Sequence, residues 1–141
     1  MISWLHLRDI LAFMSKRESI EVEGLTHTHP IPNACRIGPF LASGSIFGTD
    51  PATGKIPPGI EVQCSLLFQN VRRIVEAAGG STENILKISV YVRDKNQREH
   101  INKEWLSMFP DLHSRPARHT FQTNDMAEGT LVSCDVMAVF S

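Results

Sequence analysis

The sequence has no excess of charge of one sign and no long apolar run. Its 141 residues include 14 lysines and arginines and 15 aspartates and glutamates, which leaves a formal net charge of -1. A chain with this balance has no overall field that would attract nucleic acid or an anionic membrane. No apolar stretch approaches the roughly 20 residues that a membrane-spanning helix needs. We therefore expect neither nucleic acid nor a membrane as a partner.

Closely spaced cysteine pairs are also missing. The three cysteines are far apart and lack the short spacings of zinc sites; they are Cys35, Cys64 and Cys134. Residues 1–13 contain Arg8 and Asp9 where a secretory signal needs an uninterrupted apolar core. We therefore expect a cytoplasmic protein with reduced thiols and no metal.

Residues 1–19 are interpreted as an N-terminal extension of a domain at 20–141. The extension is predicted to be helical, with an apolar stripe that must rest on another surface. That stripe consists of Trp4, Leu7, Leu11 and Met14. A mitochondrial presequence is a rival interpretation, which the acidic residues Asp9 and Glu18 oppose.

The remaining sequence alternates between β-type and α-type periodicity. Strands are expected at 20–22, 40–47, 86–92, 118–123 and 131–140. Helices are expected at 60–78, which Gly79-Gly80 ends, and at 97–109, which Pro110 ends. Segment 27–33 contains two prolines and is expected to be a loop. Gly44 interrupts its strand, which indicates a bulge or a close approach of another group to the backbone.

This order, ββαβαββ, predicts a single α/β (α+β) domain whose sheet is covered by two helices on one face. The other face of the sheet then needs a cover as well. A second copy of the chain is a natural candidate.

Four stretches occur together in a recognisable order. They are Ser43-Gly44-Ser45-Ile46 with Asp50-Pro51-Ala52-Thr53-Gly54; Gln63 with Asn70-Val71 and Ala77-Ala78-Gly79; Val90 to Asp94 with Asn102; and Arg115-Pro116-Ala117-Arg118. Over roughly residues 36–140, this pattern resembles the YjgF/RidA family (reactive intermediate deaminase A), also known as endoribonuclease L-PSP-like proteins.

The resemblance implies a chorismate-mutase-like fold and a homotrimer with a central barrel and three clefts between subunits. Deaminating members hydrolyse enamines and imines, such as 2-aminoacrylate, to keto acids and ammonia without a cofactor. Other members are linked to ring-cleavage products such as 2-aminomuconate. The implied partner is thus a small carboxylate-bearing metabolite.

Arg118 matches the family arginine that binds the substrate carboxylate, and a guanidinium offers the planar fork of donors that a carboxylate needs. A surface or interface ion pair is the alternative role. Asn102 matches a polar helix residue near the cleft, with simple solvation as its alternative. Gly44 and Thr120 match cleft-lining positions, and packing is the alternative for each.

Ser133 departs from the family pattern, because deaminating members have a glutamate there that positions the attacking water. A serine hydroxyl can hold water, but its pKa is too high for it to act as a base unaided. Asp135 lies two residues on and should share its side of the strand. It could take over part of the glutamate's role, or it could make a structural ion pair at an interface.

Three functions are considered, of which the third comes only from the older naming of the family. The leading hypothesis is a cofactor-free deaminase of a small enamino or imino acid that uses Arg118, Ser133, Asp135 and Thr120. The second is a non-catalytic protein that binds keto acids in the same cleft. Ribonuclease activity or translation inhibition is the third, which the lack of a basic stripe disfavours. His27 and His29 lack a third ligand nearby in sequence and are expected to be solvated loop residues.

Overall fold

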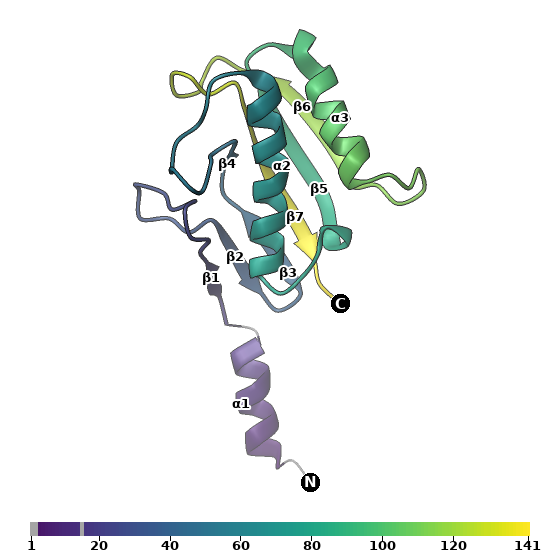
Figure 1. The fold of residues 1–141 in the computed structure, drawn as a ribbon. Coiled ribbons are helices and arrows are strands. Elements are labelled where there is room, and N and C mark those ends of the chain that lie inside the picture. Colours follow the sequence, from purple (N-terminus) through teal and green to yellow (C-terminus); the bar gives the residue numbers. More distant parts are fainter. Residues whose placement is uncertain (1–2, 15) are drawn as a thin grey trace.

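The computed structural model describes residues 3–14 and 16–141, with the side chains of residues 11–14 outside the described part. Helix α1 (Trp4–Met14) projects away from the rest of the chain (Figure 1). Trp4 and Leu7 are exposed, so no other part of the described chain covers these two positions of the stripe; Leu11 and Met14 lie outside the described side chains. The division of the chain at residue 19 stays a prediction.

A mixed sheet forms the body of the molecule, in the order β1-β2-β3-β7-β5-β6, with β4 also paired to β7. Its strands are β1 (Glu18–Ile20), β2 (Ala34–Ile37), β3 (Phe40–Ser43), β4 (Ile46–Phe47), β5 (Ile85–Val92), β6 (Ala117–Gln122) and β7 (Val132–Val139). Strands β5 and β6 are parallel, and the other pairs are antiparallel.

The two long helices of the body, α2 (Ile60–Ala77) and α3 (Arg98–Met108), lie on the same face of the sheet (Figure 1). Helix α3 forms the crossover that a parallel β5–β6 pair requires. Two short 3-10 helices, η1 (Thr82–Asn84) and η2 (Lys95–Gln97), precede β5 and α3. None of the helices in the described ranges is long and apolar enough to cross a membrane.

The core lies between these helices and the sheet. Alternate residues of β5 and β7 are buried there together with the inner face of α2. The strand residues are Ile88, Val90, Val92, Val132, Cys134, Val136 and Ala138. On the opposite face, Phe40 and Met137 remain 64% and 50% exposed. The predicted α+β domain with helices on one face is confirmed.

The N-terminal strands differ from the expectation. The first strand ends at Ile20 and does not reach Val22, because the Val22 amide donates to the side-chain oxygen of Asn33 at 2.8 Å instead of to a neighbouring strand. Strand β2 was not predicted. It is only four residues long, and it forms because Gly38, with φ of 56°, turns the chain directly into β3.

The predicted irregularity at Gly44 is a bulge. Ala42 pairs with Met137 and Ile46 pairs with Cys134. The chain therefore advances four residues from β3 to β4 while β7 advances three, which leaves one extra residue on the β3–β4 side. Within the bulge, the Val136 amide donates to the Ser43 hydroxyl at 2.8 Å. This break divides the predicted strand 40–47 into β3 and β4.

Candidate functional site

Arg118 lies on β6, the edge strand of the sheet beside α3 (Figure 1). The strand register pairs it with Ile88, whose side chain is buried beneath the helices. Because side chains alternate along a strand, Arg118 and Thr120 face the helix-covered side. Both residues are half-buried. Arg118 and Thr120 thus share one face of the strand, as expected, and their roles in a cleft stay predictions.

Two residues of α3 hold the guanidinium of Arg118. Its Nη2 atom donates a 2.7 Å hydrogen bond to Asn102 Oδ1. Its Cζ atom lies 4.9 Å from the centroid of the Trp105 ring, a distance suited to a cation–π interaction. Both contacts orient the guanidinium, and neither neutralises its charge.

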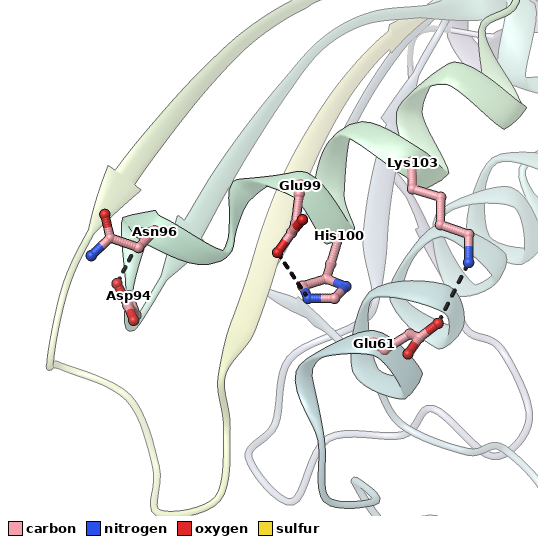
Figure 2. A network of polar contacts seen from close by, with 6 residues as sticks. All are labelled: Glu61, Asp94, Asn96, Glu99, His100 and Lys103. Atoms are coloured by element: carbon pink, nitrogen blue, oxygen red, sulfur yellow. Dashed lines mark hydrogen bonds and ion pairs between the residues drawn. The ribbon is translucent and has the colours of Figure 1, made fainter.

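The guanidinium has no acidic partner in the described part of the chain. The ion pairs found there are His100 with Glu99 and Lys103 with Glu61 (Figure 2). The Nη1 atom of Arg118 is buried and has no hydrogen-bond partner among the residues that the structure describes. Burial, and then the nearby positive charge of Arg98, lower the pKa of Arg118. A buried donor without a partner is costly, so this site favours an incoming anion.

A shallow pocket of about 420 Å³ opens beside the guanidinium, lined by Asn102, Trp105, Leu106 and Arg118. Trp105 is almost buried and contacts Phe109 edge to face at a centroid distance of 4.8 Å, so its predicted core position is confirmed. Its second contact, with Arg118, was not predicted. The helical spacing of Asn102 and Trp105, three residues apart, was the available signal, because such positions share a face.

Ser133 and Asp135 lie on β7 and face away from the helices. Their neighbour Cys134 is buried beneath the helices, so alternation turns both residues to the opposite, open face of the sheet. Ser133 is nevertheless buried there, and Asp135 is half-buried. The register places Ser133 opposite Tyr91 and Asp135 opposite Ser89. The two residues share one side, as expected, but it is the side opposite to Arg118. Within one chain, these residues do not meet the guanidinium.

Tyr91 adds a phenol to the open face beside Asp135. Burial, followed by the charge of Asp135 and a hydrogen bond with it, raises the pKa of Tyr91. The Tyr91 ring stacks on Phe121 at a centroid distance of 5.4 Å, and Phe121 lies 3.8 Å from His119. Tyr91, Phe121 and Asp135 come from three strands, so no local sequence pattern could have indicated this group.

Gly44 lies between β3 and β4, and strands β7 and β5 separate it from β6. A Cβ atom at Gly44 would have the Pro32 carbonyl oxygen as its nearest neighbour at 3.7 Å, and Gly44 is not among the glycines with positive φ. Neither packing nor backbone geometry within the described residues therefore requires glycine there. At Gly48, in contrast, a Cβ atom would collide with the backbone of Gln63.

The two histidines of the predicted loop differ in their burial. Among the described residues, no group of three His, Cys, Asp or Glu side chains is placed to hold a metal ion. His29 is exposed, as expected. His27 is half-buried beside Phe47, with a distance of 6.5 Å between the ring centroids, and its Nε2 atom has no hydrogen-bond partner within the described ranges. It lines a separate pocket of about 360 Å³ under the loop.

The sequence is similar to several known proteins. Residues 26–140 match the family model described as Endoribonuclease L-PSP. A RutC family protein of Aquifex aeolicus is 31% identical over 110 residues, which are 78% of this chain and 88% of that protein. TdcF of Escherichia coli, provisionally named a reactive intermediate deaminase, is 30% identical over 127 residues, which are 83% of this chain and 97% of its own.

Solved structures show the same similarity. The crystal structure of Escherichia coli TdcF with bound serine has a TM-score of 0.80 at 26% identity and covers 88% of this chain and 99% of its own. RidA of the Antarctic bacterium Psychrobacter sp. PAMC 21119 has a TM-score of 0.80 at 22% identity, covers 87% of this chain and 99% of its own, and supports the fold alone. The chain therefore belongs to the YjgF/RidA (RutC, L-PSP) family and has its chorismate-mutase-like fold.

Proposed function

We propose that this chain is one subunit of a homotrimeric, cofactor-free deaminase that hydrolyses a small enamino or imino acid to a keto acid and ammonia. The environment of Arg118 carries the proposal, because among residues 3–14 and 16–141 its guanidinium has no acidic partner and its Nη1 atom has no hydrogen-bond partner. A substrate carboxylate would supply both missing partners. TdcF, with its provisional deaminase name and its bound serine, supports the same ligand class.

Assembly supplies the rest of the proposed site. Arg118 lies on the edge strand β6 and contacts Asn102 of α3, whereas Ser133 and Asp135 lie on β7 and Gly44 lies between β3 and β4. The free edge of β6 and the exposed apolar residues of the open face both favour contact with another copy. In a trimer, the open face of one subunit would meet the β6 edge of the next and complete a cleft.

The reaction needs a positioned water and a route for its protons. Arg118 binds the carboxylate and so orients the iminium carbon. Ser133 holds a water that attacks this carbon, and Asp135 accepts a proton from the water and returns it to the nitrogen. The C–N bond then breaks, so that iminium and water become a carbonyl group and ammonium.

A binding protein for keto acids is the second candidate. Ser133 favours it, because a serine occupies the position where deaminating relatives are expected to have a carboxylate. This function requires only Arg118 and the trimer. The ribonuclease of the family model's description has less support, because the net charge of -1 provides no attraction for RNA.

The test measures ammonia release from an imino acid that an amino-acid oxidase generates in the assay. We expect the protein to speed release above the buffer rate, and Arg118→Gln to lose both this rate and 2-oxovalerate binding while the trimer persists. Arg72→Gln, which changes an exposed arginine on α2, is the matched control. Binding without any acceleration would support the second candidate. Dissociation of the trimer by Arg118→Gln, with affinity unchanged per folded subunit, would refute both.

A further inference from the structure

Arg98 lies on the same face of α3 as the two residues that hold Arg118. Asn102 follows it by four positions and Trp105 by seven, which places all three on one side of a helix. Residues four apart on a helix have Cβ atoms about 5–6 Å from each other. Asn102 and Trp105 both contact Arg118. Arg98 does not line the pocket itself, but it lies one helical turn before Asn102 on the face that the pocket borders.

The nearby carboxylates are engaged elsewhere. Glu99 lies 3.7 Å from His100, and Glu61 pairs with Lys103 at 3.5 Å. The Asp94 carboxylate accepts a hydrogen bond from the backbone N–H of Asn96 at 2.9 Å. Figure 2 shows these three pairs around the first turns of α3. Within the described chain, Arg98 therefore has no ion-pair partner.

Arg98 and Arg118 are close enough to repel each other. The positive charge of Arg98 is the second cause, after burial, that lowers the pKa of Arg118. Two nearby cations that share no anion among the described residues are unfavourable, and a ligand with two negative groups would relieve their repulsion. Leu106, 53% exposed, adds an apolar surface in the same pocket on which a short carbon chain can rest.

We propose that Arg98 is a specificity-determining residue that binds a second carboxylate, so that the preferred substrates are the enamines or imines of dicarboxylic acids. Arg118 binds the carboxylate next to the reacting carbon, and Arg98 binds the distal one. The inference rests on the proposed function, because it assigns Arg118 the same ligand group. It narrows the substrates to dicarboxylates, to which 2-aminomuconate belongs, and it adds a residue that no family motif in the sequence marks.

The experiment compares two keto acids with the same carbon skeleton. 2-Oxoglutarate ends in a carboxylate and 2-oxovalerate ends in a methyl group. Titration calorimetry gives the Kd of each for the wild-type protein and for Arg98→Gln, Arg118→Gln and the control Arg72→Gln. Since Arg98 is exposed, its replacement should leave the fold intact, and circular dichroism checks this.

We expect the wild-type protein to bind 2-oxoglutarate about tenfold more tightly than 2-oxovalerate, as one charge-assisted hydrogen bond allows. Arg98→Gln should bring this ratio close to one, Arg118→Gln should weaken both acids, and Arg72→Gln should change neither. The wild-type preference should shrink as salt is added.

A ratio that Arg98→Gln leaves unchanged would overturn the role of Arg98, and so would an equal loss for both acids. If Arg118→Gln still weakens both, the proposed function survives this failure. If Arg118→Gln changes neither acid, or if the wild-type protein binds neither, the proposed function fails as well.

Discussion

The Nη2 atom of Arg118 and the Oδ1 atom of Asn102 are 2.7 Å apart, in a hydrogen bond between residues 16 positions apart in the chain. The bond ties the edge strand β6 to helix α3. It uses a neutral amide where a carboxylate would have cancelled the charge of Arg118. The guanidinium is therefore oriented and still free to bind an anion.

Asn102→Ala and Asn102→Asp should separate orientation from charge. Without the amide, the guanidinium loses one orienting bond, and we expect 2-oxovalerate affinity to fall about threefold to tenfold, as for one hydrogen bond. An aspartate would pair with Arg118 and compete with the ligand, so affinity should fall further, by more than about tenfold. Titration calorimetry on both variants measures the difference.

Asn96→Ala is the control for these variants, because Asn96 is an exposed asparagine on η2, the short helix that precedes α3. It should bind as the wild-type protein does. Equal affinities for Asn102→Ala and Asn102→Asp would show that Asn102 does not control the charge of this site.

Gly44→Ala should mainly weaken ligand binding, whereas Gly48→Ala should mainly lower the unfolding free energy. Gly44 has room for a Cβ atom, with its nearest neighbour at 3.7 Å, so we expect a change in unfolding free energy below about 1 kcal/mol together with weaker ligand binding. Gly48→Ala would push against the Gln63 backbone and should cost about 1–3 kcal/mol. Urea denaturation and calorimetry measure the two effects. Normal binding by Gly44→Ala would remove Gly44 from the site.

Ser133→Glu should raise the rate of imine hydrolysis. A glutamate at this position adds a carboxylate to the open face beside Tyr91 and Asp135, where it could hold and deprotonate a water. General-base catalysis of this kind contributes about 10²–10⁴-fold, and we expect at least tenfold in ammonia release. Ser133→Gln, similar in size and uncharged, should not accelerate the reaction. Equal rates for both variants would argue against a base at this position.

Two buried thiols should make the protein less stable in alkali. Burial, and then the charge of Glu104, raise the pKa of Cys64 from 9.0 to about 12, and burial first also raises that of Cys134. Between pH 9.0 and about 12 the unfolded chain releases the Cys64 proton and the folded chain keeps it. The two thiols thus leave the unfolding free energy unchanged below about pH 9. Above that pH they lower it, by about 1.4 kcal/mol per pH unit for each thiol.

Cys64→Ala should make the decline of the unfolding free energy with pH less steep, by about 1.4 kcal/mol per pH unit, which corresponds to one proton. The smaller side chain should also lower stability at every pH. Urea denaturation at several pH values above 9 compares the slopes. Cys35→Ala, at a half-buried position on β2, is the control and should keep the wild-type slope. An unchanged slope in Cys64→Ala would contradict the assigned pKa.

Local patterns predicted the helices well and the short strands poorly. Helix α2 was expected at 60–78 and ends at Ala77. The prediction succeeded because apolar residues recur at helical spacing over many residues and Gly79-Gly80 follows them. Helix α3 differs by one residue at each end from the expected 97–109. Strand β2 was missed because its four residues carry too short a pattern, and it exists through its pairing with β3.

The amino-acid sequence by itself determined the family, the two main helices and the identity of Arg118, because these depend on residue types at fixed spacings. It also determined that Ser133 and Asp135 share a side, since alternation along a strand is local. Only the tertiary structure decided that this side faces away from Arg118, with β5 inserted between β6 and β7. The physical reason is that strand order and the choice of covered face come from hydrogen bonds and burial between distant segments, which no local period encodes.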